Sequence, residues 1–418
     1  MAAIIKKSGR ILLLLIVLSY CIRLIIGLYL GVAHSDYGWD FRSYYYGAKA
    51  YQEDKNPYDY EVLNQEAAPL GVFPFAYPPP ALWFFNIFTF LSYQVAALVW
   101  LFLRLAMIGI LVFLWRKYFN PSNSSVVFYL MLLFAFDAAI FWDFKAGNVS
   151  IVEQFFLWMG LLFLLKKRPL VFCLFVLLAS IFKVTPILFL CLLPLSSIKN
   201  KWKYFIGALV SFLALTACCY MISPALMRHY IVSIVSGPRT LERAVDFNYA
   251  LLPFWEEIVL TVASLTHTAV PLMIARILYG LSVIGILWIT AAALGWKSPS
   301  RICRDPRLLI MLGCVVYVLL VPRIKCYSYI IMIAPAYYIM MEYLSAKAYP
   351  FIFLLTIIPV HNPLPEDTII LQYRLYYLLF ATLAIWILYL YYIRRALLRV
   401  PGDDSYTDAS PPKNTSPV

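Results

Sequence analysis

About twelve apolar stretches run through the chain, and they dictate what it can fold into. Some, such as 11–33, 93–115, 204–222 and 371–392, have about the 20 residues that an α-helix needs to cross a bilayer. Only 13% of the residues are charged and 63% are hydrophobic, whereas soluble domains have about 25% charged residues. The sequence therefore predicts an all-α polytopic membrane protein and excludes a soluble enzyme, a disordered regulator and a coiled coil.

Shorter apolar stretches leave the number of spans open by about two. The other expected hydrophobic helices cover 125–142, 150–165, 169–182, 186–198, 268–295, 308–321, 327–344 and 350–360. The apolar stretch Ala81–Leu91 is too short to cross a membrane, so we expect an interfacial or re-entrant helix there.

The basic residues are distributed as a membrane topology requires. The chain has 34 lysines and arginines against 21 acids, a net charge of +13. If the amino terminus is cytoplasmic, most of the basic residues fall in cytoplasmic turns, as the positive-inside rule demands. The charge thus requires no nucleic-acid partner. We expect a multi-pass plasma-membrane protein with both termini cytoplasmic.

This topology predicts one transmembrane domain over residues 1–400. Two long outer loops would cover about 34–92 and 223–267, and a polar, proline-rich tail at 401–418 would be a disordered cytoplasmic extension. The eight cysteines form no C-x-x-C motif, and the four histidines are scattered. We therefore expect no metal site and no cofactor.

The first outer loop carries seven of the 21 acids. If residues 36–51 form a helix, Asp36, Asp40 and Tyr44 share one face at i, i+4 spacing. Asp40 stands among aromatic residues, where a partly shielded carboxylate gains a raised pKa and can act as a general base. The alternative is an ordinary solvated loop whose tyrosines form an interfacial belt.

A second candidate cluster surrounds Lys183, between two helices that are each too short to cross the bilayer. Thr185 is expected to cap the second helix and Pro186 to take its first position. A helix amino terminus beside a lysine suits an anion. The alternative is a lysine that snorkels to the membrane surface.

Other polar residues lie at outer turns or inside spans. Arg323 and Lys325 are cations on the less basic side, where they could bind phosphate or lipid headgroups. Asn148 or Ser150 is expected to cap the helix that follows. The expected spans contain charges that are costly in a membrane and should face the bundle interior: Arg23, Arg104, Asp137 and Glu153. A weaker signal precedes Tyr249, at Arg239, Arg243, Asp246 and Asn248.

An acid, recessed cations and a bilayer together suggest transfer of a sugar from a lipid-linked phosphosugar. The order of short motifs adds to this expectation. The motifs are Asp40, Tyr44-Tyr45, Lys55-Asn56-Pro57-Tyr58, Tyr77-Pro78-Pro79, Gly147-Asn148, Lys183 to Pro186, and Asn248. In this order they resemble glycosyltransferase family 87 over most of residues 34–250. Two positions depart from that pattern: Asp54 stands where glycine is common, and Asn148 where glutamine is usual.

The resemblance implies a GT-C fold and a polyprenyl-phosphate sugar donor, such as the mannose-carrying lipid. The acceptor would be a lipid or glycan on the outer face, and membrane lipids would surround the enzyme. Asp40 would be the catalytic base, and Lys183, Arg323 and Lys325 would contact phosphate. The other implied substrate-binding residues are Tyr44, Tyr45, Asn56, Tyr58, Tyr77, Asn148 and Asn248.

Two other kinds of membrane protein remain alternatives. A polytopic transporter or lipid-linked-sugar flippase would explain the many spans and the buried charges, but it predicts paired halves with matching broken helices, which the sequence lacks. A glycan polymerase or ligase would carry its main outer loop late in the chain. A transporter or flippase also gives no reason for an acid-rich, proline-punctuated first loop.

Overall fold

The chain folds into a bundle of α-helices, which confirms the predicted all-α class of polytopic membrane protein. The computed structural model describes residues 2–120, 125–235, 248–268, 270–295, 306–344, 350 and 376–398. Within these segments the one element of β structure is an isolated antiparallel bridge between Asn248 and Lys325. The predicted tail at 401–418, most of the expected span 350–360, and Arg239, Arg243 and Asp246 lie outside the described residues.

The helices of the first half are α1 (Ala2–Ala33), α2 (Trp39–Gln52), α3 (Tyr60–Ala67), α4 (Pro79–Phe85), η1 (Asn86–Phe90), α5 (Tyr93–Leu114), η2 (Trp115–Phe119), α6 (Ser125–Ala146), α7 (Ser150–Leu165) and α8 (Pro169–Phe182). Those of the second half are η3 (Thr185–Cys191), α9 (Leu192–Leu195), α10 (Lys201–Ile222), α11 (Pro224–Val235), α12 (Leu251–Thr266), α13 (Met273–Ala293), α15 (Pro306–Leu320), η6 (Cys326–Tyr329), α16 (Ile330–Tyr343) and α19 (Tyr377–Leu398).

Five described helices are long and apolar enough to cross a membrane by length and composition. They are Tyr93–Phe119, Val127–Ala146, Lys201–Ile222, Met273–Ala293 and Tyr377–Arg395. At 1.5 Å per residue, the 22 residues of α10 extend over about 33 Å, which matches a hydrocarbon core of about 30 Å. By the same measure the 14 residues of α8 reach only about 21 Å, as the sequence predicted.

The core lies where α7, α15 and α16 pack together. Every residue of α16 from Ile330 to Met340 is buried, which is the pattern of a helix surrounded by others. The outer helices show the opposite pattern. Large apolar side chains on α10 and α13, such as Leu213 (58% exposed) and Ile284 (63% exposed), point away from the protein. Exposed apolar faces on long helices are those expected against lipid.

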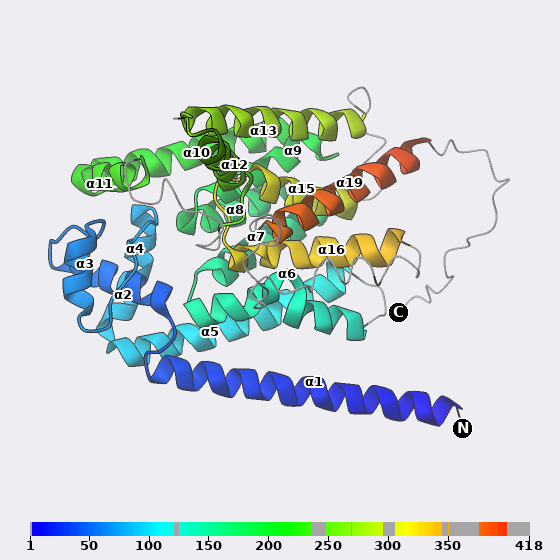
Figure 1. Cartoon of the computed structure of the whole chain (residues 1–418), viewed down its shortest axis with the longest axis horizontal. Coiled ribbons are helices and arrows are strands. Elements are labelled where there is room, and N and C mark those ends of the chain that lie inside the picture. The colour runs from blue at the N-terminus through cyan, green and yellow to red at the C-terminus, as the bar shows by residue number, and fades with distance from the viewer. Residues whose placement is uncertain are drawn as a thin grey trace.

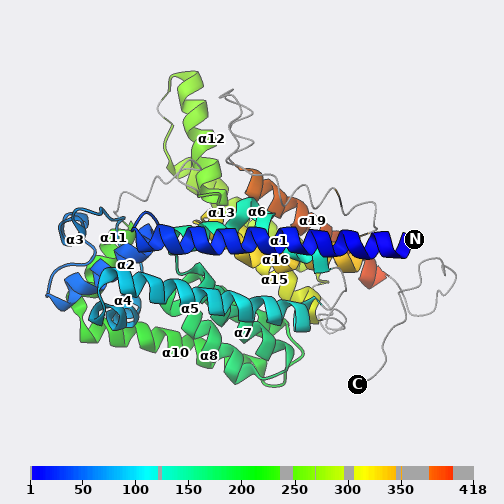
Figure 2. The ribbon, with the colours of Figure 1, turned by 90° about the horizontal axis from the view of Figure 1, so that it is seen from below.

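The elements sort to two ends of the bundle. Figure 1 shows α2, α3, α4 and α11 gathered at one end, and the beginning of α1 with the end of α19 at the other. Seen from below, α1 runs along the bundle and α12 projects from its side (Figure 2). The two ends therefore have different character: one is built from short helices and loops, and the other from the ends of long helices.

The structure corrects several local expectations. The first helix after α1 begins at Trp39 rather than at residue 36, because Gly38 adopts a left-handed conformation with φ 81°, so exposed Asp36 does not share a helical face with Asp40. Arg23 is exposed and does not face the bundle interior, whereas Arg104 and Glu153 are buried as predicted.

Two helical expectations also change. The predicted helix at Ala81–Leu91 is divided into α4 and the 3-10 turn η1. The second outer segment, expected as a loop, contains helices α11 and α12. Thr185 does not cap η3 as predicted, because η3 begins with Thr185 itself and Val184 takes the cap position.

Candidate active site

Asp40 lies in the first turn of α2, which docks on the turn between α6 and α7. The Gly38 N–H donates a hydrogen bond of 2.9 Å to the Lys145 carbonyl. One turn later the Phe41 ring stacks on Trp100 at 5.5 Å, and the Trp100 indole donates to the Gly147 carbonyl at 2.9 Å. Three helices thus fix the position of the Asp40 backbone.

The close approach of α2 to this turn requires glycine at position 147. Gly147 has φ 73°, and a Cβ there would lie 2.9 Å from the Gly38 Cα and 3.0 Å from the Phe41 Cβ. Beneath the turn, Arg104 (1% exposed) pairs with Asp143 (0% exposed) at 3.1 Å and donates to the Asp143 carbonyl at 2.8 Å. This buried pair holds the end of α6, which leads into the turn that carries Asn148.

Asn148 joins Asp40 to two tyrosines. Its side-chain nitrogen donates to Asp40 Oδ2 at 2.6 Å and lies 3.2 Å from the Tyr44 hydroxyl and 3.3 Å from the Tyr77 hydroxyl. The two hydroxyls are themselves 2.7 Å apart. Asn148 Oδ1 accepts from the backbone N–H and the hydroxyl of Ser150, which begins α7. The predicted proximity of Asp40, Tyr44, Tyr77 and Asn148 is therefore seen in the structure.

Opposing influences act on the Asp40 carboxyl. Burial raises the pKa of Asp40 above its ordinary value of 3.8, and the Asn148 hydrogen bond and the positive charges of Lys325, Arg323 and Lys183 lower it in part. All three cations therefore lie close enough to act on the same carboxyl group. Burial beside Asp40 also raises the pKa of Tyr77, so both nearby tyrosines stay neutral at physiological pH.

Lys183 approaches from the turn after α8. Its ammonium donates to the hydroxyls of Ser150 at 2.7 Å and Ser328 at 3.2 Å, and it forms an ion pair with Glu153 Oε2 at 2.7 Å. Glu153 is 2% exposed, so the pair is anchored in the interior. The Lys183 side chain keeps 23% of its surface exposed. Lys183 therefore points into the protein rather than snorkelling to the membrane surface.

A continuous chain of polar contacts joins the acid to this cation. It runs from Asp40 through Asn148 and Ser150 to Lys183 and Glu153. Behind it, the Tyr317 hydroxyl lies 3.4 Å from Glu153 Oε1 and 2.8 Å from the Thr185 hydroxyl. Thr185 thus serves this network instead of a helix cap.

Asn248 positions the segment that carries Arg323 and Lys325. Asn248 is 3% exposed, and its side-chain oxygen accepts from the Ile324 N–H at 3.0 Å. The Tyr249 N–H donates to the Ile324 carbonyl at 3.0 Å, which completes the bridge between Asn248 and Lys325. Asn248 therefore acts on the site through the backbone between the two cations.

Three other predicted residues lie farther out. Asn56 accepts from the Tyr58 N–H at 3.0 Å, and the Tyr58 hydroxyl donates to the Tyr77 carbonyl at 2.9 Å, so this pair supports Tyr77 from behind. Tyr45 points elsewhere: its hydroxyl donates to the Leu91 carbonyl at 2.8 Å and its ring packs on Tyr93. Of the tyrosine pair, the structure places only Tyr44 beside Asp40.

Sequence patterns did not assign Ser150, Ser328 or Tyr327 to the site. Ser328 lies 3.3 Å from Ser150, although 178 positions separate them in the chain, and no local motif marks it. Tyr327 is close enough to Asp40 for the carboxylate to raise the pKa of Tyr327, after the larger effect of burial. In the described segments, no three His, Cys, Asp or Glu side chains come together as a metal site requires.

The all-α bundle, with a partly shielded acid and several cations at one end, defines the protein as a membrane protein with a candidate active site. The family model of glycosyltransferase family 87 matches residues 75–322, more than half of the chain. The chain therefore belongs to glycosyltransferase family 87 and is a membrane glycosyltransferase. No curated protein and no solved structure matches it. The matched region begins after Asp40 and extends further toward the carboxyl terminus than the sequence motifs.

Proposed function

We propose that the protein transfers a hexosyl unit, mannosyl in kind, from a polyprenyl-phosphate donor to a lipid or glycan acceptor on the outer face of the plasma membrane. The observation that carries this proposal is the contact chain from Asp40 to Lys183, which holds an acid and a cation at fixed separation in one site. Asp40 is the catalytic residue, and the site belongs to a single membrane domain over residues 1–400.

The cations bind the donor's phosphate. Arg323 can offer a phosphate two parallel hydrogen bonds, and Lys183 and Lys325 add point charges. Exposed apolar faces on the long helices keep this site next to hydrocarbon, where the polyprenyl chain remains. A donor phosphate bound here places its anomeric carbon between the cations and Asp40.

The reaction needs one base and one stabilised leaving group. An acceptor hydroxyl gives its proton to the Asp40 carboxylate while its oxygen attacks the anomeric carbon. The bond between the anomeric carbon and the phosphate oxygen breaks, and lipid phosphate leaves with the electron pair. Lys183, Arg323 and Lys325 stabilise the charge that develops on that phosphate. Tyr44, Tyr77 and Asn148 line the same site and orient the sugar and the carboxylate.

A transfer assay tests the proposal and identifies the donor. The purified chain is reconstituted into liposomes with radiolabelled polyprenyl-phosphate mannose, polyprenyl-phosphate glucose or a nucleotide sugar, and the products are identified. We expect transfer from a polyprenyl-phosphate sugar, and we expect it to persist in EDTA. Movement of intact donor across the bilayer without product would instead favour a flippase. Transfer only from the nucleotide sugar would contradict the proposed donor.

A further inference from the structure

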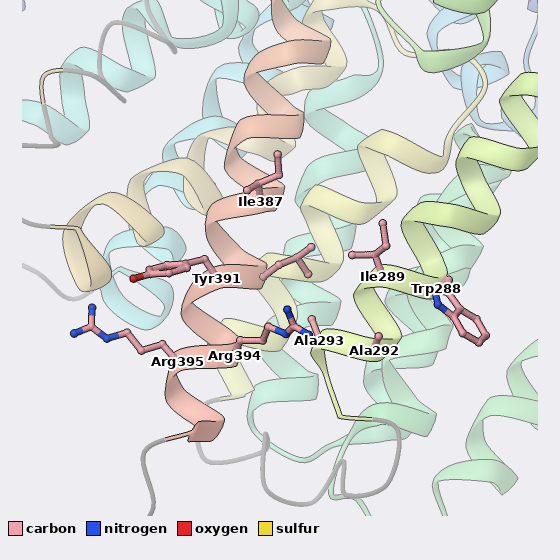
Figure 3. Close-up of a pocket in the computed structure, with 9 residues that line it drawn as sticks. Trp288, Ile289, Ala292, Ala293, Ile387, Tyr391, Arg394 and Arg395 are labelled. Carbon is pink, nitrogen blue, oxygen red and sulfur yellow. The ribbon is translucent and has the colours of Figure 1, made fainter. Parts of the chain in front are cut away.

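A groove lies at the other end of the bundle, between α13 and α19. Its cavity of about 850 Å³ falls within the range of about 300–1,000 Å³ that small-molecule sites occupy. The walls are mostly apolar, and two arginines stand at one end (Figure 3). The lining residues are Trp288, Ile289, Ala292, Ala293, Ile387, Leu390, Tyr391, Arg394 and Arg395.

A hydrogen bond joins the two helices beside the cavity. The buried Trp386 indole donates to the Thr290 hydroxyl at 3.0 Å, so α13 and α19 are joined there. On the far side of α19 the Tyr389 hydroxyl donates to the Pro335 carbonyl at 2.7 Å and fixes the rotation of the helix. The groove is therefore a defined shape between anchored helices.

The two arginines bring positive charge to one end of the groove. Arg394 extends toward Ala293 across the cavity, whereas Arg395 extends on the side of Tyr391 (Figure 3). Both are exposed, and neither has a hydrogen bond or an ion pair among the described residues. Arg395 lies in the last turn of α19, where a cation also favours the helix dipole. The contacts of Arg394 among the described residues give no comparable reason for a cation at this position.

The groove is distinct from the site around Asp40. The beginning of α19 packs against α12, where Phe254 contacts Phe380 at 5.7 Å, shortly after Asn248 in the chain. From Phe380 to Arg394 the helix extends over about 21 Å. A phosphate bound by Arg394 is therefore not the one that Lys183 and Arg323 would hold.

We propose that the groove binds an anionic glycerophospholipid, with an acyl chain along Ile387 and Ile289 and the headgroup phosphate on Arg394. Basic pockets between transmembrane helices bind anionic headgroups in this way, because the guanidinium pairs with phosphate while the chain stays in hydrocarbon. The lipid joins the ends of α13 and α19 and stabilises them. A lipid without net charge would occupy the same apolar groove but would gain less from the positive charge of Arg394.

Lipid binding to the full-length protein tests the proposal. Binding of phosphatidylglycerol, phosphatidylcholine and inorganic phosphate is measured by native mass spectrometry and by thermal shift in detergent. We expect tighter binding of phosphatidylglycerol and about a five- to tenfold loss of its affinity in Arg394→Gln. The exposed Arg168→Gln, which removes the same charge outside the groove, should change nothing. Equal affinities for the two lipids, or an unchanged Arg394→Gln, would overturn the proposal.

Two further variants distinguish the contribution of the groove's shape to lipid binding from that of the Arg394 charge. They also guard against misfolding as the cause of lost binding. Arg394→Lys keeps the cation and should lose less affinity than Arg394→Gln. Ala292→Trp narrows the groove and should also weaken binding, whereas Ala217→Trp on the exposed face of α10 should not. Tight binding in Ala292→Trp would place the lipid elsewhere. If inorganic phosphate stabilised the protein to the same extent as phosphatidylglycerol, the groove would be a site for free anions. That result would contradict the proposed lipid ligand.

Discussion

At the scale of single residues, the candidate site depends on side chains that neutralise and orient one another. Asn148 donates to Asp40 and accepts from Ser150, and Ser150 in turn accepts from Lys183. Each of these four side chains therefore contacts the next one along the chain, as in the networks that satisfy buried polar groups. Removal of one side chain from this network should therefore change the charge state or the stability of the side chain that it contacts.

The first prediction concerns the pH dependence that Asn148 imposes on Asp40. Asn148→Leu keeps the side-chain shape but removes the hydrogen bond that lowers the pKa of Asp40. Because the base must be deprotonated, the fall of the transfer rate at acid pH should then begin at a higher pH than in the wild type. The rate measured from pH 4 to pH 8 checks this. Asn56→Leu is the control, since Asn56 does not contact Asp40. In this variant the fall of the transfer rate at acid pH should begin at the same pH as in the wild type.

The second prediction separates phosphate binding from folding at Lys183. Lys183→Met leaves the Glu153 charge buried without its partner and should cost about 3–5 kcal/mol of stability. The double variant Lys183→Met/Glu153→Gln should recover most of the thermal stability but not the transfer activity. Melting temperature and transfer rate are measured for both proteins. A double variant with wild-type transfer would return Lys183 to a structural role.

The sequence indicated which residues are candidates for the site, but not which side chains they contact through hydrogen bonds. The structure joins Asp40, Tyr44, Tyr77, Asn148 and Lys183, which the family motifs assign to the site, in one contact network. Their order in the family motifs made this possible. Ser328 could not be predicted, because a serine carries no pattern that shows which distant turn it will meet.

At the scale of elements, the site depends on how α2 is seated on the turn between α6 and α7. The hydrogen bond from Gly38 to Lys145 and the stacking of Phe41 on Trp100 bring α2 down on this turn. Adjacent helical residues point about 100° apart, so this seating turns Tyr44 toward Asn148 and Tyr45 toward Leu91. A double-tyrosine motif alone does not tell which ring faces the site.

The third prediction tests this seating. Gly147→Ala adds a Cβ that would lie 2.9 Å from the Gly38 Cα, at a backbone conformation that alanine disfavours. We expect a loss of about 1–3 kcal/mol in stability and a larger loss of transfer, because α2 and Asp40 must shift. Gly109→Ala on α5 is the matched control, since a Cβ there has open space around it. Equal behaviour of the two variants in melting and transfer would show that the close approach has no role.

Element boundaries were harder to predict wherever the apolar pattern was weak. The long apolar helices α5, α10 and α13 and the shorter helix α15 correspond to expected spans. Helices α11 and α12 were not predicted, because with 12 and 16 residues they are shorter than the apolar run that marks a membrane span. The start of α2 was misplaced by three residues, since Gly38 ends the preceding turn in a conformation that side chains disfavour.

At the scale of the whole molecule, the two ends of the bundle have separate proposed roles. The end with α2 and Lys183 holds the candidate active site, and the end with Arg394 holds the proposed phospholipid groove. The beginning of α1 and the end of α19 both lie at this second end (Figure 1). If the amino terminus is cytoplasmic, as we propose, the candidate active site faces outward.

The fourth prediction tests this orientation. In a cysteine-free background, a cysteine at Glu61, exposed on α3, should react with a membrane-impermeant thiol reagent in intact cells. A cysteine at Lys199, exposed before α10, should react only after permeabilisation. The opposite pattern would place the site on the cytoplasmic face.

The fifth prediction concerns Asp40 itself. Asp40→Asn removes the base but keeps an atom that can accept from Asn148, so folding and donor binding should persist. Loss of a general base costs about 10²- to 10⁴-fold in rate. The matched control is Asp36→Asn, which removes an exposed acid outside α2 and should leave transfer unchanged.

The most direct measurement is the single-turnover transfer rate of Asp40→Asn in proteoliposomes that contain a labelled polyprenyl-phosphate sugar at saturation. We expect donor binding within about twofold of the wild type and a rate lowered by at least about 10²-fold. Transfer at more than about a tenth of the wild-type rate, with donor bound equally well, would contradict the assignment of Asp40 as the base.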